Sequence, residues 1–219
     1  MIEYSKRLRK KIKPVFENVE IKNTIGEVIS ANDKFQLRIA ETEKYAHVTY
    51  FLNGGVEDKF SGEERILVPS PRVKTYDKQP EMSAYEVRDK VLANLKKKKF
   101  DFIVLNFANP DMVGHTGNLS ATIKAVETVD KCIGDIYHYC KKYNYTLVLT
   151  SDHGNADQMY DKKKKIICTT HSINPVPFII CEKCIYNKKT GKLADIAPTI
   201  LKILDIRQPT DMNGSSLIK

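Results

Sequence analysis

An aspartate and a histidine lie side by side where a short apolar run gives way to a turn. Asp152 and His153 come soon after the run 145–149, whose β-branched and aromatic residues predict a buried strand, and Gly154 follows them. In open α/β sheets, ligands bind at the carboxyl ends of the strands. A carboxylate oxygen beside an imidazole nitrogen suits manganese or zinc better than calcium. The pair therefore predicts part of a metal site.

Further residues of the same kind occur in two other loops. Asp111 and His115 lie four apart after the apolar run 102–105, and His171 precedes the apolar run 176–181. A sheet would bring the three loops together at one edge, which gives two carboxylates and three imidazoles. These donors exceed what one tetrahedral metal with an open position requires. They predict a pair of metals, as in enzymes that transfer phosphoryl groups.

The alternative for each histidine is a structural role. A single loop histidine is more often a hydrogen-bonded structural residue than a metal ligand. The other two histidines, His47 and His138, lie in predicted helices. It is the joint pattern of acids and imidazoles after successive apolar runs that favours a metal site.

Strands and helices alternate along the second half of the chain. Strands are predicted at 35–40, 65–69, 102–105, 145–149 and 176–181. Helices are predicted to begin near 23–29 and at Ser83, each with a capping box, and to span 120–141 and 193–205. A short helix or turn within 40–55 ends in a glycine pair. This order predicts an α/β fold with a mostly parallel sheet flanked by helices.

The net charge of +9 over 219 residues does not predict a nucleic-acid-binding surface. The basic residues concentrate in three short runs, at 6–13, 96–99 and 162–165, which are predicted as a tail and solvated loops. The composition, with 42% hydrophobic and 29% charged residues, is that of a globular protein. No apolar run is long enough for a membrane-spanning helix, and no secretory signal is recognisable. We expect no nucleic acid and no membrane as partners.

The five cysteines predict reduced thiols and a cytoplasmic location. Their number is odd, and most lie in apolar segments, which disfavours a disulfide framework. Cys181 and Cys184 form a single CxxC without a second pair. Such a pair alone is a weak zinc or redox signal, and we interpret it as two structural thiols.

Five longer motifs carry a resemblance to a known family. In chain order they are AETEKYAHVTYFLNGG, YDKQPEMSAYEV, NFANPDMVGHTG, TSDHGNAD and THSINPVP. In this order and spacing, from Val19 to Lys219, the chain resembles cofactor-independent (2,3-bisphosphoglycerate-independent) phosphoglycerate mutase of the alkaline phosphatase superfamily. The resemblance implies an alkaline phosphatase-like fold. It also implies a glycolytic isomerase that interconverts 2-phosphoglycerate and 3-phosphoglycerate by two-metal phosphoryl transfer through a phosphoserine.

The resemblance also assigns roles to individual residues. It implies that Asp111, His115 and His171 ligate one manganese ion. Asp152 and His153 would ligate a second manganese ion. Lys44, within AETEK, matches the lysine that contacts the phosphate of the substrate. Magnesium, zinc or cobalt are the alternatives to manganese.

The same resemblance predicts what this chain does not supply. The family enzymes are longer and begin with a segment that carries the nucleophilic serine and a further metal-binding aspartate, and they contain an inserted substrate-binding domain. We therefore expect residues 1–18 to be a basic arm or a remnant of the inserted domain. Residues 19–219 would be the C-terminal part of the phosphatase domain. The sheet would be incomplete because N-terminal strands are missing, which favours association through its edge.

No serine of this chain is expected to replace the missing nucleophile. Ser151 and Ser172 adjoin predicted ligands, but direct neighbours on a strand point to opposite faces. The isolated chain is therefore expected to be inactive as a mutase. The alternatives are another metalloenzyme of the superfamily, such as a phosphopentomutase or a phosphatase, or a non-catalytic metal-binding module.

Overall fold

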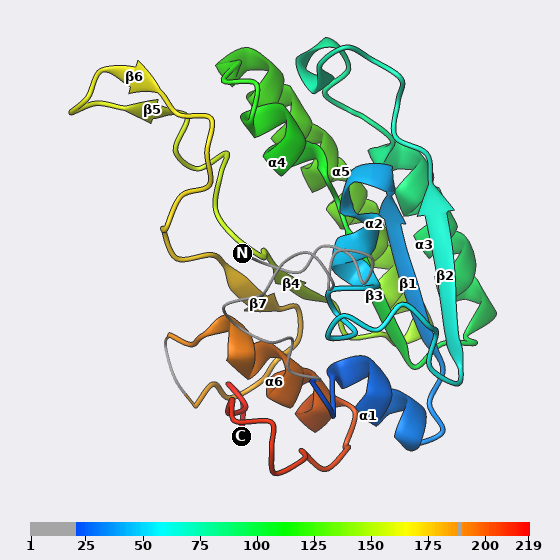
Figure 1. Ribbon diagram of the computed structural model, residues 1–219. Helices are drawn as coiled ribbons and strands as arrows, with labels where there is room; N and C mark the ends of the chain where they lie inside the picture. Colours follow the sequence, from blue (N-terminus) through cyan, green and yellow to red (C-terminus); the bar gives the residue numbers. More distant parts are fainter. Residues whose placement is uncertain (1–20, 188–189) are drawn as a thin grey trace, which may run out of the picture.

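The computed structural model describes residues 21–187 and 190–219. The predicted arm at 1–18 lies outside the described residues. The described chain contains a three-stranded sheet, two small two-stranded sheets and six α-helices (Figure 1). The predicted α/β class is confirmed.

A parallel three-stranded sheet forms the main body. Its strand order is β2-β1-β3, with β1 spanning Gln36–Glu41, β2 Glu63–Val68 and β3 Phe102–Asn106. Ile39 of β1 lies opposite Ile66 of β2 and Leu105 of β3. The first and last residues predicted for these three strands lie within two residues of those in the structure. Among the described residues, β3 lies at one end of this sheet.

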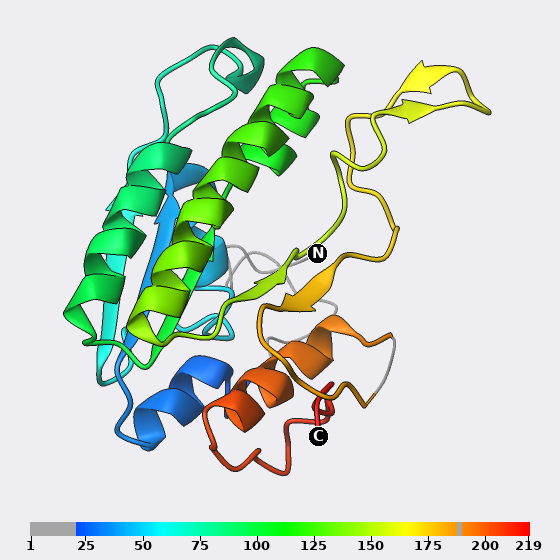
Figure 2. The same cartoon turned by 180° about the vertical axis from the view of Figure 1, so that it is seen from behind.

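Two long helices cover one face of the sheet (Figure 2). They are α3 (Ala84–Lys97) and α5 (Leu119–Tyr143). The main hydrophobic core lies between them and the sheet, and its buried members are Ile39, Val68, Val87, Val91, Leu95, Ile136 and Cys140. The burial of this apolar area is the main favourable term in folding, since it removes apolar surface from water.

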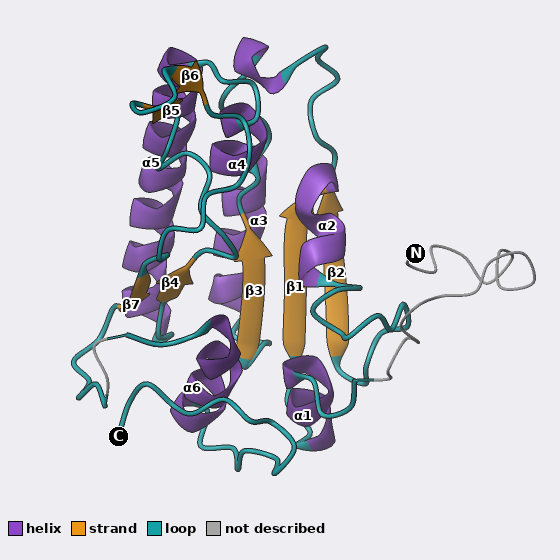
Figure 3. Ribbon diagram, turned by 60° about the vertical axis from the view of Figure 1, so that its left-hand side comes forward, coloured by secondary structure: helices purple, strands orange, loops and turns teal. Residues whose placement is uncertain are grey.

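The remaining helices lie at the two ends of the strands (Figure 3). At the amino ends, α1 (Ile25–Ala31) packs with α6 (Ile196–Ile203), which follows the short 3-10 helix η3 (Leu193–Asp195). At the carboxyl ends lie α2 (Thr42–Val48), which follows β1, and α4 (Asn109–Gly114), which follows β3. A second 3-10 helix, η2 (Tyr76–Lys78), lies in the predicted surface loop between β2 and α3.

The last two predicted strands do not join the parallel sheet. In the structure, β4 (Val148–Thr150) pairs antiparallel with β7 (Phe178–Ile180). Between them, β5 (Tyr160–Asp161) and β6 (Ile166–Ile167) form a hairpin that projects from the body (Figure 1). The predicted mostly parallel sheet is confirmed for β1, β2 and β3, but the sequence did not predict that β4 and β7 form a separate antiparallel pair. The chain between β4 and β7 contains no crossover helix, so it returns to the edge it left and runs in the opposite direction.

Of the two predicted capping boxes, the one at α1 is formed in part. At α1, the Thr24 hydroxyl accepts a hydrogen bond from the Glu27 amide, and the Glu27 carboxylate accepts one from the Asn23 amide. At α3, Ser83 is the N-cap residue but makes no capping hydrogen bond. Its hydroxyl instead donates to the Pro69 carbonyl at 2.7 Å, which fixes the end of β2 to the start of α3.

The predictions of reduced thiols and of no membrane-spanning helix can both be compared with the described residues. All five cysteines are free thiols, and Cys132 and Cys140 are buried. Within 21–187 and 190–219, no helix combines the length and the apolar content needed to cross a membrane.

Strand β1 is buried along its whole length, although half of its side chains are polar. The Arg38 guanidinium donates to the Gln36 amide oxygen at 2.6 Å, and the Gln36 amide nitrogen donates to the Gly26 carbonyl at 2.8 Å. At the carboxyl end of the strand, Glu41 is fully buried and accepts a hydrogen bond from the Ser70 hydroxyl at 2.9 Å. Burial disfavours the charged form and raises the pKa of Glu41 to about 7.

The raised pKa of Glu41 predicts a pH-dependent stability. Its stabilising contribution is full below the unfolded pKa of 4.5 and is lost as the pH rises through about 7. We expect Glu41→Gln to gain up to about 3 kcal/mol of unfolding free energy relative to the wild type between about pH 5 and about pH 8. Urea unfolding at the two pH values measures this difference. The same substitution at exposed Glu86 is the control, and equal profiles for both variants would contradict the prediction.

Candidate metal centre

The candidate residues lie at the carboxyl ends of the strands. Lys44 lies in α2, directly after β1, and Asp111 lies in the first turn of α4, soon after β3. Asp152 and His153 follow β4, and His171 lies in the loop between β6 and β7. Strands β1, β3 and β4 end at this edge, and β7 begins beside the end of β4. Side chains from distant parts of the sequence therefore meet there.

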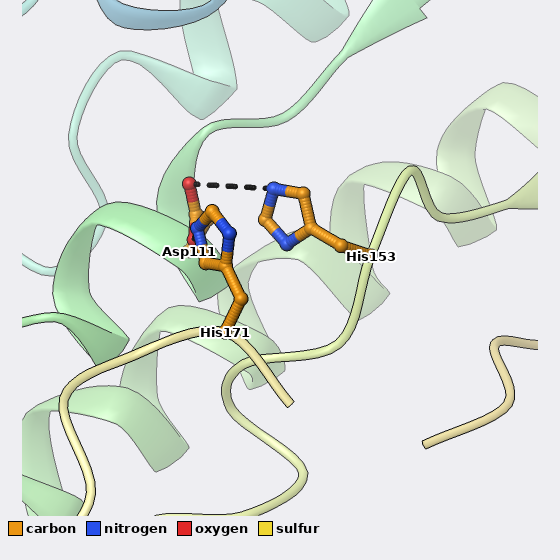
Figure 4. Close-up of side chains that lie close together, drawn as sticks. All are labelled: Asp111, His153 and His171. Atoms are coloured by element: carbon orange, nitrogen blue, oxygen red, sulfur yellow. Dashed lines mark ion pairs between the residues drawn. The ribbon is translucent and has the colours of Figure 1, made fainter. Parts of the chain in front are cut away.

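Asp111 is the residue that most of the others contact. One of its carboxylate oxygens, Oδ1, lies 3.1 Å from His115 Nε2 and 3.2 Å from His171 Nε2. The other, Oδ2, lies 2.7 Å from Lys44 Nζ and 3.9 Å from His153 Nε2 (Figure 4). Both oxygens therefore face nitrogen atoms of other candidate residues.

The three predicted imidazoles lie against one another. His171 Nε2 is 3.2 Å from His115 Nε2, and the rings of His153 and His171 stack with their centroids 3.6 Å apart. His115 Nδ1 lies 2.7 Å from the Thr169 carbonyl oxygen. The carbonyl accepts a hydrogen bond from the Nδ1–H group, which leaves Nε2 as the nitrogen able to bind a metal.

Lys44 carries a buried positive charge between the two aspartates. Its side chain is 3% exposed, and its Nζ lies 2.7 Å from Asp111 and 3.6 Å from Asp152. His153 Nε2 is 3.5 Å away. Burial alone would raise the pKa of Asp111, but hydrogen bonds from Lys44 and Asn155 outweigh it and lower the pKa below its ordinary value. Asp111 is therefore held as a carboxylate, the form that binds metals.

The structure brings together all six residues singled out in the sequence. The residues of the expected first set, Asp111, His115 and His171, have mutual ligand-atom separations of 3.1 to 3.2 Å. Ligand atoms of Asp111, His153 and His171 all lie within 4.8 Å of one another, and this trio combines residues from both expected sets. Among the described residues, the CxxC at Cys181 takes part in no such group of ligand atoms. Carboxylate and imidazole donors fit manganese, zinc or cobalt.

Two residues that sequence reasoning missed orient these ligands. The Asn155 side-chain amide donates to Asp111 Oδ1 at 2.7 Å. Asp157 accepts hydrogen bonds from the Ser172 hydroxyl and the Asn174 amide, and so connects the loop after β4 to the loop that carries His171. Both residues lie within TSDHGNAD, two and four positions after His153, but spacing alone did not reveal what they contact.

Gly114 permits the contact between Asn155 and Asp111. A Cβ at this position would lie 2.5 Å from Asn155 Oδ1. A contact of that length is prohibitive, so any larger residue at position 114 would push Asn155 away from Asp111. The glycine of the motif NPDMVGHTG therefore has a packing role beside the candidate metal ligands.

Comparison with known proteins assigns the chain to a family. A family model described as the metalloenzyme superfamily matches residues 15–208. The chain belongs to the metalloenzyme superfamily. A donor set of carboxylates and imidazoles around Asp111 is what membership of a metal-dependent superfamily leads one to expect.

Curated relatives refine this assignment. The chain is 53% identical over 222 residues to the 2,3-bisphosphoglycerate-independent phosphoglycerate mutase of Ehrlichia ruminantium (strain Gardel), which covers 100% of this chain and 43% of the relative. It is 56% identical over 199 residues to the enzyme of the same name from Clostridioides difficile (strain 630). That match covers 90% of this chain and 39% of the relative. This metalloenzyme chain thus spans about two fifths of the length of the curated relatives it matches.

A solved structure of a phosphoglycerate mutase has a similar fold. The fold is similar to that of a Leishmania mexicana phosphoglycerate mutase crystallised at low cobalt concentration, with a TM-score of 0.81 and 30% sequence identity. The match covers 89% of this chain and 39% of that chain. The expected likeness to this mutase fold is confirmed.

The hydrogen bond from Asn155 predicts a change in metal affinity. Residues that orient a metal ligand usually contribute ~10–100-fold to affinity. We expect Asn155→Ala to weaken Mn²⁺ binding by that factor, because Asp111 loses the donor that fixes its carboxylate. Isothermal titration calorimetry measures the change. The control is Asn32→Ala, which removes a side-chain hydrogen bond to the Val28 carbonyl in α1. Equal affinities of the two variants would count against the role of Asn155.

Proposed function

We propose that this chain is the metal-binding part of a 2,3-bisphosphoglycerate-independent phosphoglycerate mutase, which interconverts 2-phosphoglycerate and 3-phosphoglycerate. One observation carries the proposal. Lys44, two aspartates and three histidines converge at one sheet edge. They lie in a chain that is more than half identical to mutases of that name over its full length.

The contacts support the metal ligands that the resemblance implies. Asp111, His115 and His171 would hold one divalent ion, with manganese as the preferred species. Asp152 and His153 would hold a second ion. The short separations among Asp111, His153 and His171 support two positions that lie close together. Bound there, the metals would lower the pKa of an attacking hydroxyl and neutralise charge on the phosphoryl oxygens.

Lys44 is proposed to bind the phosphate of the substrate. Its ammonium lies among the same carboxylates and His153, so an oxygen-rich ligand at this site would be within its reach. A lysine contributes a compact positive charge that a phosphate can approach from several directions. The half-buried position of Asp111 reduces competition from water for the same contacts.

The two serines next to the ligands are engaged elsewhere. The Ser151 hydroxyl donates to the His153 carbonyl at 2.6 Å, and the Ser172 hydroxyl donates to the Asp157 carboxylate at 3.0 Å. A serine nucleophile needs a base or a metal that accepts its proton. This supports the view that the phosphoryl acceptor of the proposed mutase is supplied by another part of the enzyme.

The metal-binding role predicts a selective loss in a histidine variant. We expect the chain to bind Mn²⁺ and His171→Ala to weaken binding by at least about tenfold, since a ligand next to Asp111 is removed. Electron paramagnetic resonance of free Mn²⁺ gives the affinity. His138→Ala is the matched control, because exposed His138 contacts only its own helix at the Gly134 carbonyl. If both variants bind like the wild type, the assignment of His171 is wrong.

The mutase assignment also predicts an activity pattern. The 219-residue chain alone, with Mn²⁺, is expected to show no interconversion of 2-phosphoglycerate and 3-phosphoglycerate, because its nearby serines are engaged. The mutase of Ehrlichia ruminantium, assayed in parallel, is the positive control. Turnover by the chain alone would refute its description as a part of the enzyme. Release of phosphate from pentose phosphates would favour a phosphopentomutase or phosphatase instead.

A further inference from the structure

The chain contains two Asn-Gly dipeptides, Asn53–Gly54 and Asn213–Gly214. In such a dipeptide the backbone nitrogen of the glycine can attack the side-chain amide of the asparagine, because glycine carries no Cβ to hinder the approach. The attack needs an asparagine side chain that can turn toward the next peptide bond and a glycine N–H that is not hydrogen-bonded. The fold places the two dipeptides in opposite situations.

Asn53–Gly54 is held in an unreactive arrangement. The Asn53 side chain is fully buried, and its amide nitrogen donates to Glu63 Oε2 at 3.1 Å. The Gly54 amide donates to the Phe51 carbonyl at 3.1 Å. Both reacting groups are fixed by other contacts, so a reaction at this dipeptide requires local unfolding.

Asn213–Gly214 is not held in this way. Asn213 lies exposed in the segment that follows α6. Within the part of the chain that the structure describes, the Asn213 side chain makes no hydrogen bond and the Gly214 amide donates none. Neither reacting group has to break a contact before the attack, so the reaction needs no local unfolding.

The segment after Gly214 is fastened to η3 and α6 (Figure 1). The Ser215 amide donates to Asp195 Oδ1 at 2.8 Å. The Leu217 amide donates to the Thr199 hydroxyl at 2.9 Å, and the Leu217 side chain is buried. A change in the backbone at position 213 therefore acts directly on contacts that hold the C-terminal segment in place.

The packing of Gly214 leaves no space for a longer backbone. A Cβ at this position would lie 1.9 Å from the Ala194 carbonyl oxygen. Such a contact is prohibitive in a close-packed interior, so the fold requires glycine at position 214. The same requirement preserves the dipeptide that makes Asn213 reactive. An additional atom in the main chain before Gly214 would have to displace the segment.

We propose that Asn213 is a site of spontaneous deamidation through a cyclic imide. The Gly214 backbone nitrogen forms a bond to Asn213 Cγ, and the Cγ–Nδ2 bond breaks. Nδ2 leaves as ammonia and takes with it the proton of the Gly214 N–H group. Water then opens the imide at one of its two carbonyls, which gives either aspartate or isoaspartate at position 213.

Isoaspartate is expected to disturb the fold more than aspartate. Aspartate adds a negative charge at an exposed position, where substitutions usually have small effects. Isoaspartate routes the main chain through the side-chain carbon and so lengthens it before Gly214. Because Gly214 is packed against Ala194, the Ser215 and Leu217 amides have to move away from their acceptors. The modification therefore releases the C-terminal segment from α6.

The test ages the full 219-residue chain at neutral pH and maps its peptides by mass spectrometry. We expect deamidation at Asn213 to be at least about tenfold faster than at Asn53, because Asn53 reacts only after local opening. Methylation by an isoaspartyl methyltransferase identifies isoaspartate. In denaturant the two sites are expected to react at similar rates, since the fold no longer protects Asn53.

Hydrogen exchange measures the release of the segment. In the aged wild type, exchange at the Ser215 and Leu217 amides is expected to be at least about tenfold faster than in the fresh chain. Asn213→Gln keeps an exposed amide but would need a larger ring, so ageing should leave its exchange unchanged. Asn213→Asp carries the charge without the longer backbone and should exchange like the fresh wild type.

Each outcome decides for or against this modification. An intact Asn213, or equal rates at Asn213 and Asn53 in the folded chain, would overturn the inference. Faster exchange in aged Asn213→Gln would contradict the role of the imide in releasing the segment. Faster exchange in fresh Asn213→Asp would contradict the role of the longer backbone, because charge alone would then suffice.

Discussion

The Lys44 ammonium, buried and 2.7 Å from an Asp111 oxygen, is the interaction on which the site depends. A buried charge is tolerated only when it is paired, and leaving one partner alone costs ~3–5 kcal/mol. Lys44 belongs to α2 and Asp111 to α4, and Asp152 reaches the same ammonium from the loop after β4. The requirement for charge balance therefore fixes three segments relative to one another at the carboxyl edge of the sheet.

Hydrogen bonds to carboxylates extend this arrangement to the loops after β4 and β6. Asn155 holds the Asp111 carboxylate, and Asp157 joins its own loop to Ser172 and Asn174. Hydrogen bonds from Asn174 and Ser172 also outweigh burial and lower the pKa of Asp157. The loop with His171 is thus tied to the loop with His153. An arrangement held by the protein's own contacts is suited to bind metals, since little ordering remains to be done on binding.

A groove of about 1060 Å³ is lined by β3 and β4 and reaches the candidate metal ligands Asp111 and Asp152. Strands β3 and β4 lead to Asp111 and Asp152 at their carboxyl ends, and the groove between the strands ends at those residues. The small antiparallel pair β4–β7 is separated from the parallel sheet, and α6 packs with α1 in a second core.

The sequence by itself determined the α/β class, the three parallel strands, the long helix α5 and the six candidate residues. Apolar runs and capping residues indicate local secondary structure, and acids and histidines next to those runs indicate possible metal ligands. Both kinds of signal are present in the sequence itself. The tertiary structure alone decided that β4 pairs antiparallel with β7, that Ser83 bonds to Pro69, and that Asn155 and Asp157 orient the ligands. It also decided that His115, His153 and His171 lie against the Asp111 carboxylate. Each of these depends on contacts between residues far apart in the chain, which spacing along the sequence does not encode.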